Sequence, residues 1–276
     1  MPELPEVETV RRGLATVMEG RRITQVIQRR ADLRWPIPED FVGRVTGRIV
    51  ERLERRAKYL LFHLDDGTII LLHLGMSGRF LLTNPDLESF EKHDHVVFVT
   101  DEGTVVRFND ARRFGMVDLS TTDTIAEHPR LVEIGPEPLG NAFNGPALAA
   151  AIAGKRTPIK SALLDQKVVA GVGNIYACEA LFRSNISPRR QAYTVKGERA
   201  DKLATAIRQV LSEAIASGGS TLRDHVRPDG ELGYFQHGFE TYDREGEPCV
   251  REGCGATIKR LVQSGRSTFY CPKCQR

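Results

Sequence analysis

The amino-terminal segment repeats apolar residues with the period of a helix. From Leu4 to Val17 they recur at three- and four-residue steps, which place them on one face. Pro5 suits the first helical turn because a missing N–H costs nothing there, and Gly20 suits the end of the helix. The chain is therefore predicted to open on an amphipathic helix.

From about residue 22 to residue 120 the pattern changes to that of strands. The segments YLLFHLDDGTIILLHL and VVFVTDEGTVVRF each contain two apolar runs joined by an acidic-Gly turn, which predicts a hairpin. Several hairpins within roughly 100 residues favour a sandwich or barrel-like β domain, with the first helix packed beside it.

The chain then becomes rich in proline and glycine, between about residues 121 and 146. Such a stretch is typical of a domain boundary, and we predict domains at 1–130, 146–240 and 241–276 with a linker at 131–145. Helical periodicity returns in four segments, at roughly 145–154, 158–166, 174–184 and 196–217. Residues 218–238 contain five glycines and are expected to form a functional lid or a disordered connector.

Composition and charge narrow the class of protein. A chain of 276 residues with 41% hydrophobic and 27% charged residues is typical of a globular protein with more than one core. There is no apolar run near 18 residues and no basic-then-apolar leader, so we expect a cytoplasmic protein. Residues 249–276 carry a net charge of +5, whereas the remaining 248 residues sum to −2. This basic tail suggests an anionic partner, although a merely solvated tail is the alternative.

The cysteine spacing predicts a metal site. Four of the five cysteines follow a C-x4-C, 16-residue, C-x2-C pattern. Each close pair can supply two thiolates to one tetrahedral ion, and the span between the pairs fits a β-hairpin. One structural Zn²⁺ is predicted, with a redox CxxC as the alternative; the ligands are Cys249, Cys254, Cys271 and Cys274. Cys178 lies on an apolar helical face and is predicted to be a core residue.

Three further places in the sequence carry candidate binding residues. The hairpin ATIKRLVQSGRSTFYC carries Lys259, Arg260 and Arg266, which suits a phosphate backbone, whereas a structural ribbon at a protein interface is the alternative. The glycines before Asn174 favour an anion-binding helix start that Asn174 itself could cap, or a plain helical corner.

The third place is a pair of turns. NDARRFG places two arginines and Phe114 on a turn, and LHLGMSG places Met76 beside two glycines. Arginine can contact a base edge and an apolar side chain can wedge between bases, while burial in the core is the alternative for Phe114 and Met76.

Taken together, these motifs resemble those of the formamidopyrimidine-DNA glycosylase family. PELPEVETVRR, RRAKYLL, HLGMSG, DARRFG, DQKVVAGVGNIYA and SGRSTFYCPKCQ occur in order, with family-like spacing, from residue 2 to residue 275. The resemblance implies an N-terminal β-sandwich flanked by helices, then a helix–two-turn–helix domain and a β-hairpin zinc finger. It also implies excision of 8-oxoguanine and ring-opened purines from double-stranded DNA, or cleavage at abasic sites, by a bacterial protein acting at the nucleoid.

The resemblance also assigns residue roles. Pro2 would be the nucleophile after removal of Met1, and Glu3 the general acid/base. Lys58, His73, Asn174 and Arg266 would contact phosphates around the lesion, Lys58 and Arg266 close to the chemistry. Residues that fill the gap left by the flipped nucleotide would be Met76, Arg112 and Phe114, and those around the extruded base would be Glu6 and Lys160 with loop 218–236.

Two alternatives remain open within this interpretation. The first is an endonuclease VIII-like glycosylase for oxidised pyrimidines; Leu4 and the complete Met76/Arg112/Phe114 set favour the purine branch, and Ala111 in place of a common proline alters little. The second is a non-enzymatic, zinc-stabilised DNA-binding protein. We expect a monomer without a small-molecule cofactor or membrane association.

Overall fold

The computed structural model describes residues 1–83, 90–220 and 234–276. Their contacts divide into two compact units. Unit 1 comprises Met1–Val132 with residues 217–220 and Tyr234, and unit 2 comprises Glu133–Ala216 and Phe235–Arg276. No helix in these described ranges is long and apolar enough to cross a membrane.

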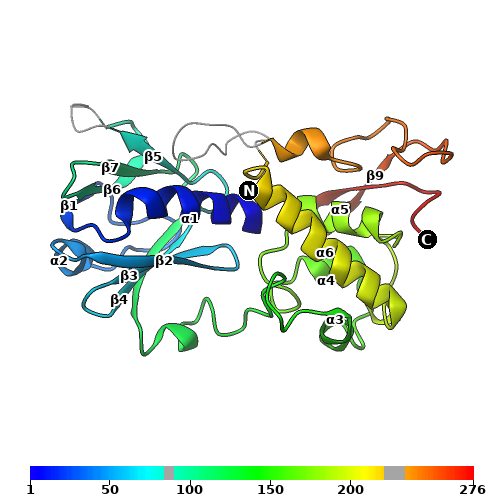
Figure 1. The fold of residues 1–276 in the computed structure, drawn as a ribbon, viewed down its shortest axis with the longest axis horizontal. Coiled ribbons are helices and arrows are strands. Elements are labelled where there is room, and N and C mark those ends of the chain that lie inside the picture. The colour runs from blue at the N-terminus through cyan, green and yellow to red at the C-terminus, as the bar shows by residue number, and fades with distance from the viewer. Residues whose placement is uncertain (84–89, 221–233) are drawn as a thin grey trace. The chain divides into compact units, whose positions relative to one another are not determined.

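Unit 1 contains two antiparallel four-stranded sheets (Figure 1). The first has the order β1 (Ile23–Gln28), β6 (Asp94–Thr100), β7 (Val105–Asn109) and β5 (Arg79–Thr83). The second has the order β2 (Val50–Arg56), β3 (Tyr59–Leu64), β4 (Thr68–His73) and β8 (Met116–Thr121). Both predicted hairpins are confirmed, as β3–β4 and β6–β7.

The core of unit 1 lies between the two sheets. Phe62 of β3 packs against Phe80 and Phe98 of the other sheet, with ring centroids about 6.2 Å apart. Helix α1 (Leu4–Met18) adds its apolar stripe to the same core, and the short helices α2 (Phe41–Val45) and η1 (Ile125–Glu127) complete the unit. The predicted sandwich with an adjacent helix is therefore confirmed.

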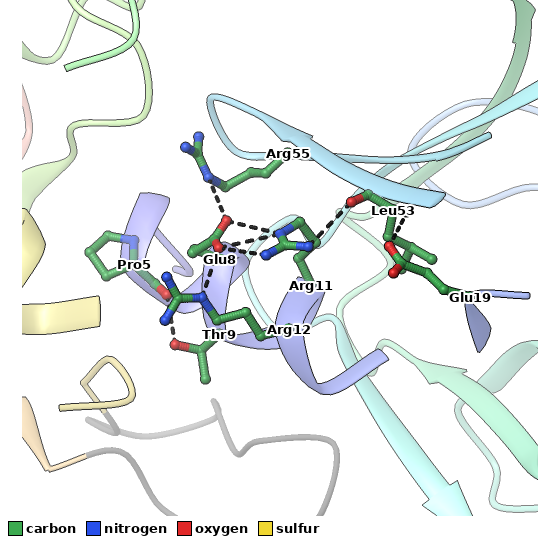
Figure 2. A network of polar contacts seen from close by, with 8 residues as sticks. All are labelled: Pro5, Glu8, Thr9, Arg11, Arg12, Glu19, Leu53 and Arg55. Atoms are coloured by element: carbon green, nitrogen blue, oxygen red, sulfur yellow. Dashed lines mark hydrogen bonds and ion pairs between the residues drawn. The ribbon is translucent and has the colours of Figure 1, made fainter. Parts of the chain in front are cut away.

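An ionic network attaches α1 to β2 (Figure 2). Glu8 accepts hydrogen bonds from Arg11 and Arg12 of its own helix and pairs with Arg55 of β2 at 3.3 Å. Burial raises the pKa of Glu8, but the hydrogen bonds from the arginines outweigh it and the pKa lies below its usual value. At the other end of the helix, Glu19 accepts the Leu53 backbone N–H at 2.6 Å. The start of α1 is thereby fixed against the strand that leads to Lys58.

Unit 2 consists of helices followed by a two-stranded antiparallel hairpin. Its elements are α3 (Gly145–Ala151), α4 (Ile159–Leu163), α5 (Asn174–Arg183), η2 (Ala192–Thr194), α6 (Glu198–Ala216), η3 (Phe235–Gly238), β9 (Lys259–Gln263) and β10 (Arg266–Tyr270). The four predicted helical segments are confirmed by α3 to α6, and Cys178 is a buried core residue of α5.

The β9–β10 hairpin closes through a two-residue turn. Ser264 and Gly265 both have positive φ, 49° and 73°, as a type I′ turn requires. This turn projects Arg266 from the first position of β10.

Two details differ from the sequence-based expectation. Gly173, not Asn174, is the N-cap of α5, and Asn174 is the first helical residue, with its side-chain amide donating to the Ser267 carbonyl of β10. In the expected loop 218–238, residues 235–238 form the 3₁₀ helix η3. Residues 221–233 of that loop lie outside the described part of the chain.

Candidate active site and nucleic-acid interface

The amino terminus of α1 is anchored by a buried carboxylate. Glu6, which is 2% exposed, accepts the Glu3 backbone N–H at 2.8 Å. The other oxygen of Glu6 accepts the N–H and the hydroxyl of Ser220 at 2.9 and 3.0 Å. Gly219 passes so close to Glu6 that an added Cβ would lie 3.3 Å from the Glu6 side chain. Pro2 and Glu3 are buried at this junction, whereas Met1 is 52% exposed.

The β2–β3 turn and the end of β4 bring Lys58 and His73 together. Lys58 follows Ala57, which has a φ of 52° in the tight turn, and Tyr59 pairs with His73 across the sheet. Burial, together with the charges of Lys58 and Arg34, lowers the pKa of His73 to about 4. Its Nδ1 accepts the Gly75 N–H at 2.9 Å, so the neutral ring carries its proton on Nε2. The pair can thus offer a phosphate one ammonium and one neutral N–H donor.

The side chains predicted to fill the gap in the duplex are exposed. Met76 is 36% exposed and Phe114 is 42% exposed, so the core alternative for both is wrong. The Arg112 guanidinium lies over the Phe114 ring at 5.0 Å, a cation–π arrangement. Unit 1 therefore presents two apolar side chains and one arginine at neighbouring turns, which suits contact with stacked bases.

In unit 2, two predicted residues converge on the carbonyl group of Ser267. The Asn174 amide donates to it at 3.0 Å and the Lys160 ammonium at 3.2 Å. Lys160 is fully buried and also donates to Thr268 at 2.8 Å, so in this structure it contacts β10. Its assignment to the base pocket and to DNA stays a prediction. Both contacts hold Ser267, the residue that follows Arg266. The Arg266 side chain itself is exposed.

The basic side chains of the hairpin face solvent. Lys259, Arg260 and Arg266 are exposed, and Arg260 donates to the Ser267 hydroxyl at 3.0 Å. These positions form a cationic edge that suits a phosphate backbone.

Sequence reasoning missed two residues that support this edge. The ring of Tyr242 contacts that of Phe269 of β10 edge to face, with centroids 5.0 Å apart, and Glu179 accepts three backbone N–H groups from residues 240–242. An acidic residue on the apolar face of the α5 segment was the only available signal.

The four predicted cysteines lie together. All four Sγ atoms lie within 4.8 Å of one another, with distances of 3.9 Å from Cys249 to Cys274 and 3.6 Å from Cys254 to Cys271. Zn–S bonds of about 2.3 Å in a tetrahedron require Sγ atoms about 3.8 Å apart, so the set fits one zinc ion. Four protein ligands leave no open position, so the zinc is structural.

Sequence models of known families match three parts of the chain. Residues 1–117 match the formamidopyrimidine-DNA glycosylase N-terminal domain, residues 134–226 its H2TH domain, and residues 246–276 a zinc finger found in FPG and IleRS. A curated formamidopyrimidine-DNA glycosylase from Ruegeria pomeroyi is 57% identical over the full length of both chains.

Solved structures agree in fold. A complex between the Lactococcus lactis Fpg and abasic-site-containing DNA has a TM-score of 0.90, with 34% identity and 99% of each chain covered. A structure of MutM in complex with carbocyclic 8-oxo-G-containing DNA also has a TM-score of 0.90, with 34% identity and all of both chains covered.

Proposed function

We propose that this chain, which belongs to the formamidopyrimidine-DNA glycosylase family and is a base excision repair DNA glycosylase acting on damaged DNA, removes oxidised purines and then nicks the strand. The proposed substrates are 8-oxoguanine, ring-opened formamidopyrimidines and abasic sites in duplex DNA. The DNA held by its structural relatives supports this choice. We further propose that it works in the bacterial cytoplasm on chromosomal DNA.

The proposed nucleophile is the amine of Pro2. While Met1 is attached, the Pro2 nitrogen is an amide without a nucleophilic lone pair; removal of Met1 converts it into a secondary amine. Attack on C1′ of the sugar breaks the N-glycosidic bond, and opening of the sugar ring gives an iminium. Because the nitrogen is secondary, this iminium is permanently charged and draws electrons for β- and then δ-elimination.

The observation that carries this proposal is the buried anchoring of the amino terminus. A frayed leader has no need of a buried carboxylate, yet Glu6 bonds both the backbone of Glu3 and Ser220. The anchor fixes Pro2 at the start of a rigid helix, which is what a nucleophile requires. Glu3, adjacent in sequence and 2% exposed, is proposed to transfer protons to and from the sugar. Glu6 is proposed to line the pocket of the extruded base, and the assignment of Lys160 to the extruded base stays a prediction.

The remaining roles follow from the surfaces of each unit. Lys58 and His73 of unit 1 are proposed to contact the phosphates around the lesion, and Asn174 and Arg266 of unit 2 to do the same. Lys259 and Arg260 would extend the phosphate contact along β9.

The apolar side chains at the turns of unit 1 have a separate role. A base must leave the stack before it can be excised, and the vacated space must be filled. We propose that Met76 and Phe114 enter the duplex there and that Arg112 donates to the orphan cytosine.

Borohydride trapping tests the nucleophile. Borohydride added during turnover of an 8-oxoguanine duplex should reduce the iminium to a stable adduct, and peptide sequencing should locate it on Pro2. Lys58→Met is the matched control, since it removes the other candidate amine and should weaken DNA binding while the adduct still forms at Pro2. An adduct on Lys58, or lyase activity in protein whose intact mass retains Met1, would refute the Pro2 assignment.

A thymine glycol duplex run in parallel tests the substrate class. Faster excision of thymine glycol than of 8-oxoguanine would contradict the purine proposal. Binding to the lesion without strand cleavage would instead indicate a DNA-binding protein that has kept only the fold.

A further inference from the structure

Two loops of unit 1 carry the three exposed residues assigned to gap filling. Residues 74–78, between β4 and β5, carry Met76, and residues 110–115, between β7 and β8, carry Arg112 and Phe114. Side chains that enter the same gap in a duplex from separate loops must keep a fixed distance from one another, because a misplacement of about 1 Å is costly at such a site.

A buried hydroxyl and a buried carboxylate connect the loops. The Ser77 hydroxyl donates to Asp110 Oδ1 at 2.6 Å, and Asp110 is fully buried. The same hydroxyl oxygen accepts the Arg112 backbone N–H at 3.1 Å. Asp110 Oδ2 accepts the Gly115 backbone N–H at 2.7 Å, which closes the loop behind Phe114. Ser77 and Asp110 thus bond the backbone on both sides of the Arg112–Phe114 turn.

The sheet in turn holds Asp110. Its backbone N–H donates to the His93 carbonyl at 3.0 Å, and its own carbonyl accepts a hydrogen bond from His95 Nε2 at 2.8 Å. The His95 ring is buried, so the carbonyl of Asp110 keeps this one orientation.

The loops also touch through their glycines. A Cβ on Gly75 would collide with the backbone of Phe114 and Gly115. A Cβ on Gly115 would lie 2.9 Å from the Asp110 carboxylate and 2.8 Å from the Phe108 ring. The two loops therefore pack backbone to backbone and leave no room to slide past each other.

We infer that Ser77 and Asp110 are positioning residues that hold Met76, Arg112 and Phe114 as one preformed wedge. This inference rests on the proposed function, because it concerns how the enzyme fills the gap in duplex DNA. Binding that must first order two loops is weaker than binding by loops already ordered. The hydrogen bond to the Arg112 backbone N–H also fixes the point from which the Arg112 side chain extends. The linked loops therefore position its guanidinium, and through it they set the preference for the base opposite the lesion.

Ser77→Ala tests the wedge through two substrates. Single-turnover excision of 8-oxoguanine from a duplex requires gap filling, whereas cleavage of a single-stranded abasic oligonucleotide has no orphan base to replace. We expect duplex excision to fall about tenfold, the usual effect of losing a buried hydrogen bond to a charged group. Cleavage of the single strand should stay unchanged, and preference for cytosine opposite the lesion should decline.

Ser120→Ala is the matched control. Ser120 is also in unit 1 and is 9% exposed, like Ser77, but its hydroxyl bonds to Thr124 of its own segment. This variant should retain both activities. Ser77→Thr keeps the hydroxyl and should restore duplex excision.

Asp110→Asn is the second variant, and it keeps the size of the side chain if Ser77→Ala is poorly folded. Its amide oxygen can accept the Gly115 N–H while the link to Ser77 weakens, so the same split between substrates is expected. Equal loss on both substrates would overturn the inference in favour of a general folding role, and so would unchanged duplex excision in both variants. A wild-type protein that cleaves neither substrate would instead overturn the proposed function itself.

Discussion

Acidification should destabilise unit 1 through His73. The pKa of this ring is lowered from 6.5 to about 4, first by burial and then by the charges of Lys58 and Arg34. Between those values the unfolded chain binds a proton at this position and the native protein does not. The contribution of the neutral His73 ring to the free energy of unfolding is therefore fully present above pH 6.5 and is lost as the pH falls towards 4.

The magnitude follows from the separation of the two pKa values. A difference of about 2.5 between the two pKa values corresponds to about 3 kcal/mol, at about 1.36 kcal/mol for a difference of one in pKa. The ring retains some solvent contact, which screens the neighbouring charges, so a loss of about 2 kcal/mol is expected.

Urea unfolding followed by circular dichroism at pH 4 to 8 measures this loss. His73→Asn is the comparison, because the asparagine oxygen can accept the Gly75 N–H as Nδ1 does but cannot bind the proton. The free energy of unfolding of the wild type minus that of the variant should rise by about 2 kcal/mol from pH 4 to 7. A difference that stays constant with pH would refute the assignment of a depressed pKa, whatever the absolute stabilities.

Three further predictions concern unit 2. Cys271→Ser should lose zinc and DNA binding together, as measured by zinc release and gel shift. DNA binding that survives metal loss would show that the β9–β10 hairpin does not hold the DNA. Lys160→Met should lower the free energy of unfolding by about 2 kcal/mol, because Thr268 loses its buried donor, and denaturant titration against the exposed-site variant Lys202→Met checks this. Burial raises the pKa of Glu179 above 4.5 despite its backbone hydrogen bonds, so its contribution to stability should decrease as the pH rises through the raised pKa. Glu179→Gln should remove that decrease from the pH profile of unfolding, and identical profiles would contradict it.

Features encoded over short distances could be predicted from the sequence. The spacing of Leu4 to Val17 defined α1, and acidic-Gly turns between apolar runs defined the hairpins, because each depends on backbone geometry within a few residues. The cysteine spacing defined the zinc set for the same reason, since two tight turns can each supply a ligand pair. Ordered motifs from residue 2 to residue 275 were sufficient to indicate the family.

The helix cap shows where local reasoning fails. Asn174 has the chemistry of an N-cap, but the Ser267 carbonyl 93 residues away offers its amide a partner, and Gly173 takes the cap position. The resemblance assigns Lys160 to the surroundings of the extruded base, and only the structure shows that its ammonium is buried against Thr268 of β10.

The sequence by itself therefore determined which elements form, which thiols bind zinc and which family the chain resembles. Only the tertiary structure decided that Ser77 bonds Asp110, that Ser220 bonds Glu6 214 residues away, and that His73 stays neutral. The physical reason is that a periodic pattern records local backbone preference, whereas hydrogen-bond partners and pKa values depend on what packing places within a few ångströms and on how much water it removes.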